Sequence, residues 1–228
     1  MTMLVDAWHV LVDAWRAEWT KARTVASTAG LLAAAVGAGV GLSAALCAAV
    51  HHDSAELTLS GVQLAQALVA VWSVRAVTGE YRTGLIGTSL IAVPRRGCLL
   101  AAKAAVIAAL SLLSGAITVG GCVLVAGLIR SLDGGATLRA SVDSIVHPGL
   151  IGLLATGIAL AVRDPAAAIG VVLGLLYLFP LAARLTTNAS WQRHLDQIGS
   201  ATAGPAVLAG WAAAAVLVGG LALRVRDP

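Results

Sequence analysis

Charged residues are scarce in this sequence. Only 11% of its 228 residues are Asp, Glu, Lys or Arg, whereas about 25% is usual for a soluble domain. Hydrophobic residues make up 59% and the mean hydropathy is +0.90. So little polar surface cannot cover a water-soluble globule of this length. The composition therefore excludes an ordinary soluble enzyme or binding domain and predicts an integral membrane protein.

Sequence motifs of catalysis are also missing. The chain has no phosphate-binding Gly-x-x-x-x-Gly-Lys-Ser/Thr, no His-Glu-x-x-His and no Gly-x-Ser-x-Gly. We therefore expect no catalytic residue, no enzymatic activity and no cofactor bound by this chain. His51, His52 and Asp53 are adjacent, but neighbours on one exposed turn seldom converge on one ion, so we expect no metal site.

Cysteine is rare, and its 3 residues show no pairing pattern. Cys47 and Cys122 both fall toward the outer ends of apolar segments, so a disulfide between them is conceivable. We favour the other interpretation, in which they and Cys98 pack as small apolar residues.

Long apolar segments are what the sequence does have. A bilayer core about 30 Å thick needs roughly 20 apolar residues of helix. The segments are rich in Ala and Gly, which let helices pack closely in lipid, and they lack the short alternating strands of a barrel. We therefore predict an all-α membrane protein, a single domain of residues 1–228 with a six-span helical bundle. The predicted spans are 28–50, 57–78, 101–129, 145–162, 166–183 and 206–223.

Basic residues are distributed unevenly around these spans. If both termini lie in the cytoplasm, eleven of the 15 Lys and Arg residues fall on the cytoplasmic side. This bias predicts a multi-pass protein of the plasma membrane with both ends inside. It also accounts for the net charge of +4 without a nucleic-acid partner. The cytoplasmic set is Arg16, Lys21, Arg23, Arg75, Arg82, Arg95, Arg96, Lys103, Arg163, Arg224 and Arg226.

The N-terminal residues before the first span predict an amphipathic helix. Trp8, Val12, Trp15 and Trp19 follow one another at spacings that place them on one helix face. Tryptophan prefers the headgroup layer, where its ring is buried and its N–H stays wet. We expect this helix, with Lys21, to lie at the membrane interface on the cytoplasmic side. A cytoplasmic extension of the first span is the alternative.

The segment 79–103 is too polar at its start, and too interrupted at Pro94-Arg95-Arg96, to cross the bilayer. Its apolar residues also argue against a solvated tail. We predict a short helix parallel to the membrane that offers its exposed face to a cytoplasmic partner. Lys103, near the start of the third span, is expected to snorkel to the membrane interface.

Polar residues are few inside the spans. Gln63 and Gln66 in the second span are the main ones, and they either line a pathway or bond to a neighbouring helix. Span interiors with essentially no ionisable group disfavour a proton-coupled or voltage-driven carrier. We therefore expect the energy for any transport to come from another subunit.

The whole layout resembles the ABC type-2 permease family, the membrane subunits of bacterial export ABC transporters. Six spans with a longer outer segment before the last one carry part of the resemblance, and two sequence stretches carry the rest. The alanine-rich, arginine-over-lysine composition is typical of a GC-rich bacterium such as an actinomycete. The stretches are Glu18-Trp19-Thr20-Lys21 and Gly79-Glu80-Tyr81-Arg82-Thr83-Gly84, the latter followed by Pro94-Arg95-Arg96 and Lys103.

The resemblance implies a mechanism and partners. Two permease halves would form a central pathway, so this chain would pair with a second copy or a related chain. Cytoplasmic ABC ATPase subunits, which hold the ATP and Mg²⁺, would dock beneath through a coupling helix. Arg95 and Arg96 would anchor that helix to lipid phosphate or to the ATPase, or would only enforce orientation. The implied coupling residues are Gly79, Glu80, Tyr81, Arg82, Thr83, Gly84, Arg95 and Arg96.

The cargo is constrained by what the chain lacks relative to larger family members. No sizeable outer domain is present, which argues against polysaccharide or protein cargo. A small hydrophobic or amphipathic substrate is left, such as a drug-like metabolite, a peptide antibiotic or a lipid, with a role in multidrug or antibiotic resistance. A non-transporting membrane scaffold or sensor that holds a cytoplasmic partner through the same segment is the alternative.

Overall fold

The computed structural model describes residues 2–24, 26–49, 55–82, 84, 96–129, 134–185 and 204–226. Within these ranges the chain is almost entirely helical and contains no strand, which confirms the predicted all-α class. The elements are α1 (Thr2–Thr24), α2 (Ala26–Ala49), α3 (Ala55–Arg82), α5 (Arg96–Ile129), α6 (Gly134–Val162), α7 (Pro165–Leu173), the π-helical turn η1 (Gly174–Leu178), α8 (Phe179–Leu185) and α10 (Pro205–Arg226).

Four of the described helices are long and apolar enough to cross a membrane. They coincide with the first, third, fourth and sixth predicted spans. The second, in α3, is not among them; α3 carries Gln63, Gln66 and Arg75. The fifth falls in a shorter apolar helix, Pro165–Leu181. The four helices are Ser27–Ala49, Gly97–Ile129, Ala140–Val162 and Pro205–Leu223.

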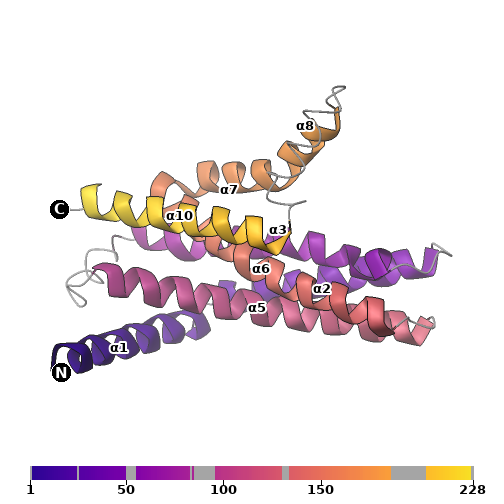
Figure 1. The fold of residues 1–228 in the computed structure, drawn as a ribbon, viewed down its shortest axis with the longest axis horizontal. Helices are drawn as coiled ribbons and strands as arrows, with labels where there is room; N and C mark the ends of the chain where they lie inside the picture. Colours follow the sequence, from indigo (N-terminus) through magenta and orange to yellow (C-terminus); the bar gives the residue numbers. More distant parts are fainter. Residues whose placement is uncertain are drawn as a thin grey trace.

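The long helices run side by side, with α6 packed against α3, α5 and α10 (Figure 1). Ile151, Leu154 and Leu160 on α6 are buried at the centre of the largest apolar core. Both ends of the described chain lie at one end of this bundle, where α3 also ends and α5 begins (Figure 1). We call it the basic end, since it carries Lys21, Arg82, Lys103 and Arg163.

Glycines bring two helix pairs into backbone contact. A Cβ added to Gly157 of α6 would overlap the backbone of Ala215 in α10, and one added to Gly219 would lie 2.7 Å from the Gly157 carbonyl oxygen. A Cβ on Gly61 of α3 would likewise overlap the carbonyl oxygen of Gly39 in α2. Such close approach is how small residues stabilise helix packing in lipid, where apolar burial gives little drive.

Pro148 lies inside α6 and is buried. The helix begins at Gly134, well before the predicted start of the fourth span at 145. A proline inside a helix removes one hydrogen bond and crowds the preceding turn. Gly115 of α5 leaves space for it, because a Cβ there would lie 3.0 Å from Pro148 Cγ. Packing on α5 thus accommodates the proline, and the helix continues through it.

The predicted turn at Arg163-Asp164-Pro165 is present between α6 and α7. Arg163 adopts a left-handed conformation with φ 64°, and its N–H donates to the Ala159 carbonyl at 2.9 Å, which ends α6. Asp164 caps α7 by accepting from the Ala167 N–H at 2.7 Å, and Pro165 takes the first helical position. The chain therefore reverses direction at the basic end.

The fifth predicted span, 166–183, contains a π-helical turn. η1 follows α7, and Pro180 lies in α8 immediately beyond it. Proline lacks the amide hydrogen of a regular helix, and π turns are common sites of bending. Figure 1 shows α8 leading away from the bundle while α7 runs along it.

The predicted coupling helix differs from the structure at its start. Gly79 to Arg82 form the last turn of α3 instead of opening a separate helix. Gly84, with φ +70° and an N–H 3.4 Å from the Tyr81 carbonyl oxygen, follows that turn as a glycine cap. Thr83 and residues 85–95 lie outside the described residues, as do 51–53 and 186–203.

The three cysteines are free thiols. Cys47 on α2 and Cys122 on α5 are buried, and Cys98 is half-buried. The disulfide that the sequence left open is therefore not formed.

Candidate functional site

Four charged side chains from three helices meet at the basic end. Lys103 of α5 donates from Nζ to Glu18 Oε2 of α1 at 2.9 Å and to Glu80 Oε1 of α3 at 2.8 Å. Lys21 of α1 donates to Glu18 Oε1 at 2.8 Å and to Glu80 Oε1 at 3.2 Å. We call these four residues the charge cluster. It joins segments that are 59 and 85 residues apart in the sequence.

The charge cluster is mostly shielded from solvent. The side chains of Glu18, Lys103 and Glu80 are 7%, 8% and 12% exposed, and only Lys21, at 44%, reaches the surface. Moving a charge out of water costs several kcal/mol, and a buried pair compensates for this only when its geometry is good. Two carboxylates and two ammonium groups at hydrogen-bond distance provide that geometry. Loss of one of the three buried members, Glu18, Glu80 or Lys103, would leave an uncompensated buried charge.

The charge cluster shifts the pKa of Glu18 and of Lys21 away from neutral pH. Burial by itself raises the pKa of Glu18, but the adjacent Lys103 and Lys21 ammonium groups outweigh burial and hold this pKa below its ordinary value of 4.5. Burial lowers the pKa of Lys21, whereas Glu18 and Glu80 raise it more, so the pKa of Lys21 lies above its ordinary value of 10.5.

We expect the melting temperature of the detergent-solubilised protein to fall as the pH drops below 4.5. A carboxyl group whose folded pKa is depressed contributes stability above its unfolded pKa and loses it as the pH falls through the folded one. Lys21, with a raised pKa, loses its contribution only above 10.5. Thermal unfolding of wild type and Glu18→Gln between about pH 3 and pH 8 measures the difference. If the melting temperatures of the two proteins fell equally at acid pH, Glu18 would be excluded as the titrating group.

Tyr81 makes a second link between helices at the basic end. The guanidinium carbon of Arg163 lies 5.1 Å from the centroid of the Tyr81 ring, a cation–π distance. Arg163 also donates from Nη2 to the Ala222 carbonyl of α10 at 3.5 Å. The end of α3 is thus connected to the α6–α7 turn and to the C-terminal helix.

The predicted coupling residues therefore have different surroundings. Glu80 and Tyr81 face other helices of the same chain, and Gly84 follows the end of α3. Arg82 is exposed. Arg96 is the first residue of α5, and its side chain, like Thr83 and Arg95, lies outside the described part of the chain.

The residues predicted to lie at the membrane interface also differ in their surroundings. Trp15 and Trp19 stack on each other with ring centroids 6.3 Å apart, and Trp15 is 36% exposed. Trp8 lies on α1, and nothing is described of its side chain. Lys21 is partly exposed, but Lys103 points into the charge cluster instead of snorkelling to the interface. Its two carboxylate partners lie far away in the sequence, so local patterning could not show them.

The two glutamines lie away from the charge cluster. Gln63 is exposed on α3, and its backbone carbonyl accepts a hydrogen bond from the Tyr177 hydroxyl of η1. Gln66 is half-buried one turn further along α3. The two glutamines therefore lie in the half of α3 that is farther from the basic end.

A cavity of about 680 Å³ lies beside the charge cluster. All four charge-cluster residues line it, together with Trp72, Arg75 and Arg82 of α3 and apolar side chains of α2, α5 and α7. Trp72 and Arg75 were not singled out as site residues from the sequence. Trp72, Arg75, Gly79 and Arg82 follow one another at spacings of three and four, which place them along one face of α3. This periodicity is the sequence feature that could have identified them as neighbours.

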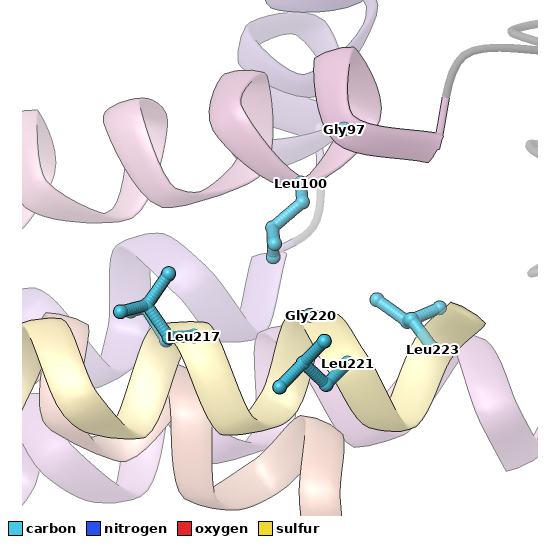
Figure 2. Close-up of a pocket in the computed structure, with 7 residues that line it drawn as sticks. Gly97, Leu100, Leu217, Gly220, Leu221 and Leu223 are labelled. Atoms are coloured by element: carbon cyan, nitrogen blue, oxygen red, sulfur yellow. The ribbon is translucent and has the colours of Figure 1, made fainter. Parts of the chain in front are cut away.

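A smaller cavity of about 200 Å³ separates the start of α5 from the end of α10 (Figure 2). Leu100 of α5 points toward α10 there, and a Cβ on Gly220 would lie 2.8 Å from Leu100 Cδ2. The lining is apolar, so we assign it no chemistry. Its residues are Gly97, Leu100, Val216, Leu217, Gly220, Leu221 and Leu223.

No protein-family model matches this sequence, and no curated protein matches it either. What the chain does must therefore be inferred from its own residues and their arrangement.

Proposed function

We propose that this chain is the transmembrane permease subunit of an ATP-driven ABC exporter, with ATP hydrolysed by separate cytoplasmic subunits. It would move a small hydrophobic or amphipathic compound out of the cell through a pathway completed by a second permease chain. The bundle of apolar helices with both termini at one end supports this proposal. The basic residues gathered at that end support its placement on the cytoplasmic side.

The ion pair between Glu80 and Lys103 is the observation that carries the proposal. Residues 83–95 connect α3 to α5 at the basic end, and an ATPase would dock on this connection. Glu80 and Lys103 lie on either side of it and form an ion pair at 2.8 Å, while Glu18 and Lys21 of α1 pair with Lys103 and Glu80, respectively. A force on the connection would therefore move three helices together instead of bending one loop.

The proposal includes six spans, with α3 as the second and the α7–α8 segment as the fifth. α3 has 28 residues and is about 42 Å long at 1.5 Å per residue, which exceeds a bilayer core of about 30 Å. α3 also packs against α2, α5 and α6, each of which is long and apolar enough to cross a membrane. Both termini would lie in the cytoplasm of a bacterium.

Co-purification tests the proposal. The tagged chain, extracted from its native membrane in a mild detergent, should bring a stoichiometric ATPase that contains a phosphate-binding loop, identified by mass spectrometry. A reproducible complex without any ATPase in two mild detergents would contradict the proposal. It would favour a scaffold or sensor that holds another cytoplasmic partner.

Arg82→Glu should reduce ATPase association about tenfold or more, a loss of about 1.4 kcal/mol. Arg82 is the exposed charged residue at the end of α3, and reversing a charge at a docking surface opposes a complementary partner. Arg16→Glu is the matched control, because Arg16 is an exposed cation of α1 outside the connection. Quantitative pull-down measures both variants. If the Arg82→Glu variant retained as much ATPase as the wild type does, Arg82 would be excluded from the docking surface.

A further inference from the structure

The cavity beside the charge cluster has the size of a small-molecule site. Its volume of about 680 Å³ falls within the range of about 300–1,000 Å³ that ligand pockets occupy. α1, α2, α3, α5 and α7 all contribute to its lining. It is therefore a space between helices that could admit a ligand from the basic end.

The charges around this cavity do not balance. Lys21 and Lys103 are neutralised by Glu18 and Glu80 within the charge cluster. Arg75 and Arg82 also line the cavity and are exposed, and no acidic side chain of the described residues forms an ion pair with either. Two uncompensated guanidinium groups favour an anion. Their planar donor forks match phosphate and carboxylate oxygens.

Trp72 adds a buried donor to the lining. It is 3% exposed, and its indole Nε1–H has no hydrogen-bond acceptor among the described residues. A buried donor without an acceptor costs about 1–3 kcal/mol, so such a group calls for an explanation. Trp72 lies three residues before Arg75 on the same face of α3. An oxygen-bearing ligand could engage the guanidinium and, after a small adjustment, the indole.

The branched apolar side chains of the lining come from α2, α5 and α7, whereas its guanidinium groups come from α3. On α5, Lys103 is followed by Val106 and Ile107, and on α7 the lining ends at Ile169. Leu31 of α2 contributes another apolar side chain. On α3 the lining runs from Arg82 to Trp72, which is about 15 Å of helix at 1.5 Å per residue. A ligand that fits must carry its charged group against α3 and its apolar part against α2, α5 and α7.

We propose that this cavity binds an anionic amphiphile, with its phosphate or carboxylate head near Arg75 and Arg82 and its chain against Leu31, Ile107 and Ile169. Either an anionic membrane lipid or a single-chain compound on its way out of the cell has this chemistry. The second source rests on the proposed export function, and the first does not.

Native mass spectrometry of the purified full-length chain tests the site, with phosphatidylglycerol and phosphatidylcholine of identical acyl chains as probes. We expect the wild type to retain phosphatidylglycerol about tenfold more strongly, and Arg75→Gln to reduce this preference at least about fivefold. Trp72→Phe keeps an aromatic ring but removes the N–H, and should weaken retention by a smaller factor. Arg75→Lys should keep part of the preference, and Arg16→Gln should keep all of it.

Equal retention of the two lipids by the wild type, or an unchanged preference in Arg75→Gln, would overturn the proposal. Melting temperatures without added lipid verify that each variant is folded. Dodecyl phosphate distinguishes the sources: displacement of phosphatidylglycerol by it shows that a single-chain anion fits, and retention of the lipid alone assigns the site to membrane lipid. ATPase co-purification is independent of these readouts, so the export function and this site can fail separately.

Discussion

Lys103→Met should lower the free energy of unfolding by about 3–5 kcal/mol, because it leaves the carboxylates of Glu18 and Glu80 buried without their central cation. Methionine keeps the length of the side chain, so little packing is lost. Denaturant unfolding of the detergent-solubilised protein, followed by circular dichroism, measures the change. Lys21→Met is the control and should cost about 1 kcal/mol or less, since Lys21 is 44% exposed.

A double variant separates the charge effect from packing. Glu80→Gln combined with Lys103→Met removes one charge of each sign and leaves Glu18 paired with Lys21 at 2.8 Å. This protein should regain part of the stability that Lys103→Met loses, giving a measurable coupling energy. Additive losses in the two single variants and the double variant would show that the charge cluster does not act as a unit.

Gly157→Val should destabilise the protein by about 3 kcal/mol or more, because its Cβ would overlap the backbone of Ala215 and backbone cannot move aside as a side chain can. We expect α6 and α10 to separate. Gly210→Val is the matched control on α10, since a Cβ there meets no atom within 4 Å. The same unfolding measurement applies to both. Equal stability of the two variants would mean that α10 is not held against α6 as the structure shows.

The charge cluster limits where the proposed ATPase subunit can dock. Glu80 and Tyr81, which resemblance to a permease family assigns to ATPase docking, hold α1, α5 and the α6–α7 turn. Their effect on coupling would then be indirect, through the position of α3. Arg82 is the exposed charge left at the end of α3, and for this reason Arg82→Glu is a sharper test of docking than a change at Glu80.

The sequence by itself determined the membrane class, the all-α fold, most helix positions and the turn at Arg163-Asp164-Pro165. These depend on local properties: the length of an apolar run, the helix cap offered by Asp164 and the fixed φ of proline. Each can be read within a window of about one helix. The helix face of α1 that carries the tryptophans was also visible at this level, and Trp15 and Trp19 stack on each other along it.

Only the tertiary structure decided where the charged side chains point. Lys103 looked like an interface residue because nothing within its own helix could neutralise it, yet its partners lie 85 and 23 residues away on α1 and α3. The cavity lined by Trp72 and Arg75 likewise exists only once five helices have packed. Charge pairing and cavities depend on distances between helices, and hydropathy and periodicity describe one helix at a time.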